Sequence, residues 1–99
     1  MKPQSALIAD QETICLPPIA LTNKVELEGE VALVIGKSGK NIKEEDALDY
    51  VLGYTVFNDV TARDLTKSDP QFTRGKGFDT FGPIGPWIVT GIDPTNLKI

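Results

Sequence analysis

The chain has 99 residues, 40% of them hydrophobic, and this composition predicts one small globular domain and excludes a disordered chain. Its formal net charge of −4 argues against nucleic acid as the main partner, because binding to phosphates needs a basic surface. No apolar run approaches the ~18 residues of a membrane-spanning helix and no signal sequence precedes the domain, so we expect a soluble, cytoplasmic protein without a membrane partner.

Residues 5–16 predict two short strands around a turn at residues 9–11. Cys15 falls in the second of these strands, and we expect it to be a small buried hydrophobic residue. It is the only cysteine, so an intrachain disulfide is excluded. Pro17 and Pro18 end this part of the chain.

Residues 25–36 form the strongest predicted strand, and acidic side chains alternate through its first half. Glu26, Glu28 and Glu30 are two residues apart, so in one strand they point to the same face. Beyond Glu30 both faces are apolar, which is typical of a strand buried on both sides and places Glu30 near a desolvated region. The acids are therefore either a solvated strand end or, together, a cation site or a carboxyl group with a raised pKa.

The rest of the chain contains more strands than helices. Strands are predicted at residues 53–60 and 87–92, and a Gly- and Pro-rich ordered loop is predicted between residues 68 and 86. The helical segments are short: residues 43–50, where Asn41 and Glu44 have capping-box spacing, and residues 61–67, where Thr61 and Asp64 do. These lengths do not suit a doubly wound sheet and favour a β-rich α+β domain with one or two short helices.

Three further residues could carry chemistry, and each has an alternative structural role. Asp59 ends a buried strand, where it either lines a cleft or caps the next helical turn. Arg63 either pairs with Asp64 on the surface or binds a carboxylate substrate. Lys76, between two glycines, is either an exposed loop lysine or part of an anionic site.

The absence of histidine narrows the chemistry. It excludes Ser-His-Asp and Cys-His catalysis within this chain, and it excludes histidine-rich zinc sites. Any metal must be held mainly by oxygen, which favours magnesium, manganese or calcium.

Three segments, "VELEGEVALVIGK", "GYTVFNDVTARDL" and "RGKGFDTFGPIGPWIVT", resemble the fumarylacetoacetate hydrolase family in their order and separation. The resemblance extends over nearly the whole chain, since "KPQSALI" and "ICLPP" are similar to the family's opening strands. It implies the mixed β-sandwich, barrel-like fold of that family. Family domains are longer, so residues 1–99 are expected to be one partial catalytic domain containing the metal-binding half.

The resemblance also implies roles for individual residues. The metal ligands would be Glu28, Glu30 and Asp59, binding Mg²⁺ or Mn²⁺, with Ca²⁺ as a possible substitute. Lys76 would be the active-site lysine and Arg63 would lie close to it, and the substrate would contact Lys76, Thr66 and Thr80. Thr66 stands where members often have a glutamine, so the usual amide contact is in doubt.

The implied function is metal-dependent chemistry on small 2-oxo or β-diketo acids. The reactions are C–C bond hydrolysis of acylpyruvates, oxaloacetate decarboxylation or tautomerisation, and isomerisation of hydroxymuconate-type compounds, through an enolate stabilised by the cation. Homodimerisation or higher self-association is expected. The alternative is a non-catalytic remnant of the same fold that binds metal or self-associates through open strand edges.

Overall fold

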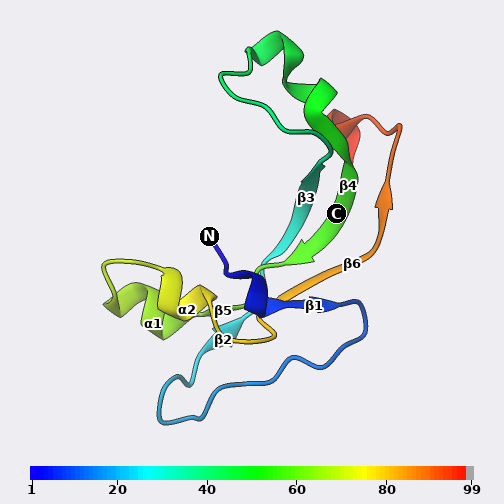
Figure 1. Ribbon diagram of the computed structural model, residues 1–99. Helices are drawn as coiled ribbons and strands as arrows, with labels where there is room; N and C mark the ends of the chain where they lie inside the picture. The colour runs from blue at the N-terminus through cyan, green and yellow to red at the C-terminus, as the bar shows by residue number, and fades with distance from the viewer. Residues whose placement is uncertain (98–99) are drawn as a thin grey trace.

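The computed structural model describes residues 1–97 and contains two small sheets (Figure 1). Four strands form a mixed sheet in the order β1-β6-β4-β3, in which only the β1–β6 pair is parallel. The second sheet is the antiparallel pair β2–β5. The strands are β1 (Leu7–Ala9), β2 (Val25–Glu26), β3 (Gly29–Ile35), β4 (Val51–Asn58), β5 (Thr61–Ala62) and β6 (Gly82–Val89).

The helical segments are short. They are the 3-10 turns η1 (Gln4–Ala6), η2 (Glu44–Tyr50) and η3 (Pro94–Asn96), with the α-helices α1 (Arg63–Ser68) and α2 (Thr73–Lys76). The prediction of a strand-rich α+β fold with few helices is thus confirmed. Among residues 1–97, no helix has the length and apolar character needed to cross a membrane.

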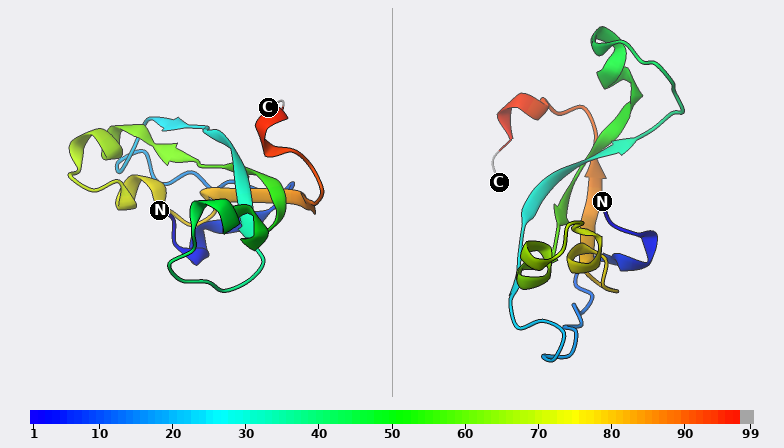
Figure 2. Two further views of the ribbon diagram at one scale, coloured as in Figure 1. Left: turned by 90° about the horizontal axis from the view of Figure 1, so that it is seen from above. Right: turned by 90° about the vertical axis from the view of Figure 1, so that its left-hand side faces the viewer.

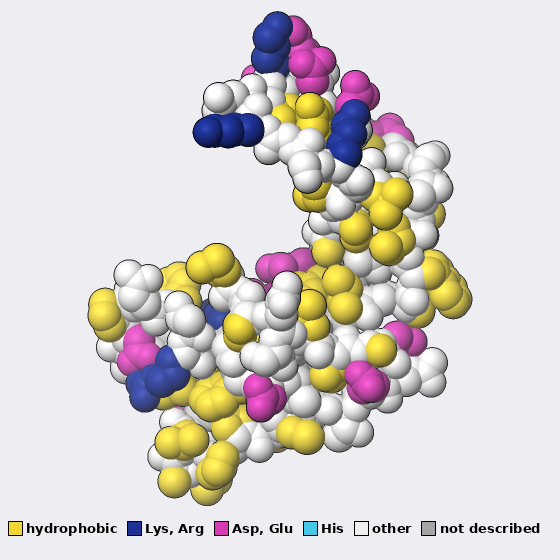
Figure 3. All heavy atoms as spheres, in the orientation of Figure 1, with side chains coloured by type: hydrophobic (Ala, Val, Ile, Leu, Met, Phe, Trp, Pro, Cys, Tyr) yellow, Lys and Arg dark blue, Asp and Glu magenta, His cyan; other side chains and the backbone are white. Residues whose placement is uncertain are grey.

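The molecule is elongated because β3, η2 and β4 extend as an arm away from the rest of the chain (Figures 1 and 2). The radius of gyration is 15.6 Å, whereas a compact domain of about 100 residues has about 13 Å. Figure 3 shows a hollow between this arm and the body that carries α1 and α2.

The buried core lies in the body, around the two-stranded sheet β2–β5 and helix α1. Val60, Ala62, Leu65 and Phe81 are buried there together, and Phe78 packs on Phe81 with 5.2 Å between the ring centroids. This core holds β5 and α1 against the loop that precedes β6, and these are the elements that surround the acidic cluster described below.

The prediction of one long strand buried on both faces was wrong. Residues 25–36 form two strands, β2 and β3, which belong to different sheets. β3 is an edge strand of the four-stranded sheet. Within residues 1–97 its apolar residues are not covered, since Leu33 and Ile35 remain 53% and 65% exposed. Figure 3 shows hydrophobic side chains at the surface of the arm, as these exposures require.

Several local predictions also need correction. Of residues 5–16, only Leu7–Ala9 pair as a strand, β1, against β6, and residues 12–16 form none. Cys15 is exposed rather than buried. The helix at 43–50 is a 3-10 helix over 44–50 without a side-chain cap. The segment 68–86, predicted as a loop, contains α2 and the start of β6. The strand predicted at residues 53–60 is β4 and runs over Val51–Asn58.

Candidate metal centre

The candidate site forms where the chain passes from one sheet to the other. Glu28 lies between β2 and β3, and Asp59 lies between β4 and β5. The antiparallel pairing of β3 with β4 sets Gly29 opposite Asn58. Just beyond this pair, Asp59 N–H donates to the Glu28 carbonyl at 2.8 Å. In addition, Glu28 N–H donates to Asn58 Oδ1 at 3.2 Å. The main-chain pairing, together with the Asn58 side chain, therefore holds the two acids side by side.

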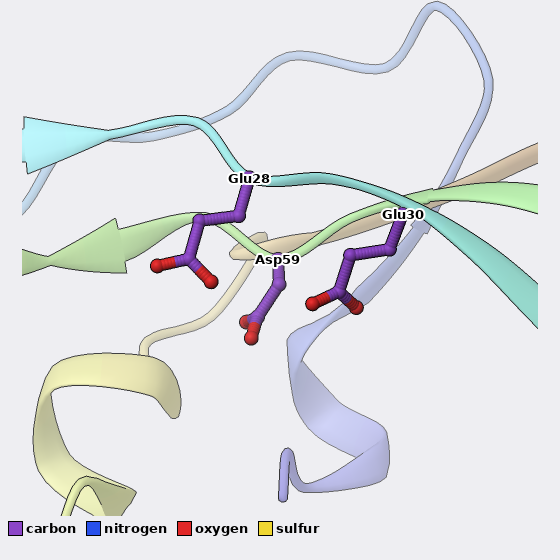
Figure 4. A group of neighbouring side chains, drawn as sticks. All are labelled: Glu28, Glu30 and Asp59. Carbon is purple, nitrogen blue, oxygen red and sulfur yellow. The ribbon is translucent and has the colours of Figure 1, made fainter. Parts of the chain in front are cut away.

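Three carboxylates converge at this corner (Figure 4). Glu28, Glu30 and Asp59 each offer one oxygen, and these atoms lie within 4.8 Å of one another. Figure 4 shows all three side chains pointing to the same side of the two neighbouring chain segments. The set that the family resemblance implied is therefore assembled in the structure, although Glu30 is exposed rather than desolvated.

The donor set fits a hard divalent cation. It consists only of carboxylate oxygens, the ligands that Mg²⁺ and Mn²⁺ prefer. Asp59 Oδ1 is buried and accepts no hydrogen bond of good geometry from residues 1–97, although Lys2 Nζ lies 2.8 Å away. A buried carboxylate oxygen with a free acceptor position is suited to a metal ion.

Lys76 lies directly on this cluster. Its ammonium donates to Glu28 Oε2 at 2.7 Å and to Asp59 Oδ2 at 2.5 Å, and its side chain is only 12% exposed. The alternative of an exposed loop lysine is therefore wrong. Burial lowers the pKa of Lys76, but the hydrogen bonds that its ammonium donates to Asp59 and Glu28 outweigh this effect and raise the pKa above its ordinary value. The amine is therefore protonated at neutral pH.

Lys2 also belongs to the site, and the sequence analysis missed it. Its side chain is 7% exposed, and Nζ donates to the carbonyls of Val60 at 2.8 Å and Lys76 at 2.5 Å besides pairing with Asp59. Burial lowers the pKa of Lys2, and the interactions with Asp59 offset this only in part. No local pattern could have revealed these contacts, because they join residues 58 and 74 positions apart.

Arg63 pairs with Glu26 and Glu28, not with Asp64 as one alternative proposed. Nε lies 2.8 Å from Glu26 Oε2, and Nη2 contacts Glu28 Oε1. Asp64 instead accepts hydrogen bonds from the Thr22 hydroxyl and the main-chain N–H of Asn23.

Neither predicted cap is present at this corner. The residue before α1 is Ala62, which makes no side-chain cap, so Thr61 and Asp64 do not form a capping box. The side chain of Asp59 pairs with Lys2 and Lys76 and caps no helix.

The two threonines named from the resemblance are engaged in local hydrogen bonds. The buried Thr66 hydroxyl donates to the Arg63 carbonyl at 3.0 Å, within α1. Thr80 has a positive φ of 69° and its hydroxyl accepts from Cys15 N–H at 2.8 Å.

Comparison with known proteins identifies the family. The family model described as fumarylacetoacetate (FAA) hydrolase, C-terminal, matches residues 1–99. The chain belongs to the fumarylacetoacetate hydrolase family. Among its relatives, a protein of Methanocaldococcus jannaschii is 56% identical over 99 residues, which are 100% of this chain and 41% of that protein. The mitochondrial oxaloacetate tautomerase of Xenopus laevis is 49% identical over 100 residues, covering 96% of this chain and 31% of that protein.

Solved structures of fumarylacetoacetate hydrolase family enzymes share the fold. The 5-carboxymethyl-2-hydroxymuconate delta-isomerase of Mycobacterium smegmatis superposes with a TM-score of 0.89 at 48% identity, covering 95% of this chain and 37% of that one. A maleylpyruvate hydrolase of Sphingobium sp. SYK-6, in complex with manganese(II) and pyruvate, superposes with a TM-score of 0.76 at 36% identity. The match covers 90% of this chain and 31% of the hydrolase chain. The chain thus spans about two fifths or less of the length of these relatives.

The acidic cluster should make the stability of this family member depend on pH. The hydrogen bond from Lys76 lowers the pKa of Glu28 from 4.5 to about 2; burial opposes this and Arg63 adds to it. Charged Glu28 therefore stabilises the fold fully above about pH 4.5, and this contribution is lost as the pH falls toward 2. Without added metal, the difference in unfolding free energy between the wild type and Glu28→Gln should shrink over this range in urea titrations.

The control for this prediction is Glu45→Gln. Glu45 pairs with Lys43 at 3.4 Å on the surface, and both side chains are more than 70% exposed (73% and 75%). Exposed ion pairs contribute little to folding stability. The unfolding free energy of this variant should therefore equal that of the wild type at every pH. A gap between wild type and Glu28→Gln that stays constant from pH 6 to pH 3 would contradict the assigned pKa of Glu28.

Proposed function

We propose that the chain supplies the divalent-metal centre of an enzyme acting on small 2-oxo or β-diketo acids, by C–C bond hydrolysis, decarboxylation or tautomerisation. The observation that carries this proposal is the convergence of Glu28, Glu30 and Asp59 beside a buried lysine. Support comes from the relatives: one is named an oxaloacetate tautomerase, and one solved hydrolase holds manganese(II) and pyruvate. Magnesium or manganese is the cofactor we propose.

The three carboxylates would hold the metal, and the metal when bound would supply positive charge next to the carboxylate and 2-oxo oxygens of the substrate. Lys76 would add a second positive charge at the same place. Its raised pKa favours a donor that stabilises negative charge on oxygen over a base that removes a proton. Arg63 pairs with Glu26 through Nε and with Glu28 through Nη2, which favours a role in holding Glu28 rather than in contacting substrate.

The threonine hydroxyls differ in what they could offer a substrate. Thr80 uses its oxygen to accept from Cys15, so its hydroxyl proton remains available for a substrate carboxylate. Thr66 uses its proton within α1, so only its oxygen remains, as an acceptor. We therefore propose Thr80 as the better anion contact of the two.

The proposal is tested by incubating the chain with oxaloacetate or acetylpyruvate, with and without Mg²⁺ or Mn²⁺, and following the enol absorbance. We expect a metal-dependent change in rate that Glu28→Gln reduces to background, because it removes a charged ligand, and that Glu45→Gln leaves unchanged. Turnover of equal rate in EDTA, or in Glu28→Gln, would overturn the metal-centred function.

A second candidate function is metal binding or self-association without turnover. The exposed apolar side chains favour it: Leu33, Val56 and Trp87 are 53%, 58% and 72% exposed, and uncovered apolar surface of this kind typically marks an interface. It predicts a metal-induced rise in melting temperature with no reaction, and a homodimer or larger species in sedimentation. Metal-dependent turnover by a monomer would exclude it.

A further inference from the structure

Glu26 is the acid of the alternating run that does not enter the metal cluster, and the structure gives it another partner. The strand breaks after β2, so Glu26 lies in the small sheet, where it is opposite Thr61. Its Oε2 accepts from Arg63 Nε at 2.8 Å, and its Oε1 lies 3.4 Å from Lys24 Nζ.

Arg63 uses the other end of its guanidinium on Glu28. Nη2 contacts Glu28 Oε1, while Glu28 Oε2 faces Lys76. The guanidinium is planar and rigid, so two contacts at different nitrogens fix its orientation, whereas one contact leaves it free to rotate. Glu26 therefore sets the direction from which Arg63 holds the Glu28 carboxylate.

We propose that Glu26 is a positioning residue of the metal centre: it anchors Arg63, and Arg63 presents the Glu28 carboxylate to the cation. This inference rests on the proposed function, because it assumes that Glu28 is a ligand. Partners that orient a metal ligand typically change affinity by about 10- to 100-fold when they are removed. Since the side chain of Glu26 is 39% exposed, the lower end of that range applies.

The test measures Mn²⁺ affinity of the chain by the electron paramagnetic resonance signal of free Mn²⁺. Glu26→Ala removes the anchor and is expected to weaken binding about tenfold. Glu26→Gln removes the charge but keeps an oxygen that can accept from Arg63 Nε, so it should weaken binding less than about threefold. If Glu26 acted only as a distant negative charge, both variants would weaken binding equally, and that result would overturn the proposal.

A double-mutant cycle separates the role of Arg63 from that of charge. In an Arg63→Met background, Glu26→Ala should have no further effect on Mn²⁺ affinity, because its action requires Arg63. An unchanged tenfold loss there would overturn the proposal. If the wild type itself binds no Mn²⁺, the metal-centred function and this inference both fail, whereas wild-type binding that Glu26→Ala does not alter refutes this inference alone. Circular dichroism confirms that each variant is folded.

Discussion

Replacing Asp59 by asparagine is expected to abolish the stabilisation of the fold by Mn²⁺. Asp59 carries the buried oxygen Oδ1, which has no hydrogen bond of good geometry among the described residues. One carboxylate oxygen of Asp59 also lies within 4.8 Å of one oxygen each of Glu28 and Glu30. A ligand at 100 times its dissociation constant stabilises the folded state by about 2.7 kcal/mol. In Mn²⁺ the wild type should gain this much unfolding free energy. Asp59→Asn should gain none, because its amide oxygen is neutral and binds a divalent cation more weakly than a carboxylate does.

The comparison must be made within each variant, with Mn²⁺ against EDTA. Asp59→Asn also weakens the ion pairs with Lys2 and Lys76, so its melting temperature should fall even without metal. Asp46→Asn is the matched control, because Asp46 is an exposed carboxylate in η2. A metal-induced shift in Asp59→Asn as large as in the wild type would show that Mn²⁺ binds elsewhere.

The position of the cluster was predictable from the sequence because it depends on strand geometry. A spacing of two residues places Glu28 and Glu30 on one side, and the end of the next strong strand brings Asp59 to them through antiparallel pairing. Residue spacing alone left a solvated strand end as an alternative. The family resemblance chose the ligand set, and the structure brings those three residues together.

The separate role of Glu26 was not predictable from periodicity. The pattern "VELEGEV" continues the alternation without interruption, yet the chain leaves one sheet at residues 27–28 and enters another at Gly29. What ends β2 is its pairing with β5, which extends for only two residues. This partner is distant in sequence, so a local pattern could not reveal the break.

The exposure of the arm was mispredicted for a similar reason. Apolar residues on both faces of residues 31–35 indicate a strand that is covered on both sides, but within residues 1–97 Leu33 and Ile35 stay more than half exposed. The sequence pattern reports how much apolar surface a strand offers, and it does not report which segment covers that surface.

Replacing Lys2 by methionine is expected to lower the free energy of unfolding by about 3 kcal/mol in the absence of metal. Methionine has a similar length but no charge, so Asp59 loses one of its two cations while remaining only 15% exposed. Breaking a buried ion pair by removing one partner typically costs 3–5 kcal/mol. Lys76 still pairs with Asp59, which favours the lower end of this range, and the carbonyls of Val60 and Lys76 lose a donor as well.

Urea titrations of Lys2→Met test this expectation, with Lys43→Met as the control. The side chain of Lys43 is 75% exposed, so its replacement should lower the free energy of unfolding by less than about 0.5 kcal/mol. The double variant Lys2→Met with Asp59→Asn should be more stable than the sum of the two single losses predicts, because it removes the buried charge together with its partner. Mn²⁺ should also stabilise Lys2→Met more than the wild type, since the ion replaces the missing cation next to Asp59. Equal losses in Lys2→Met and Lys43→Met would show that Lys2 is not a buried counter-ion of Asp59.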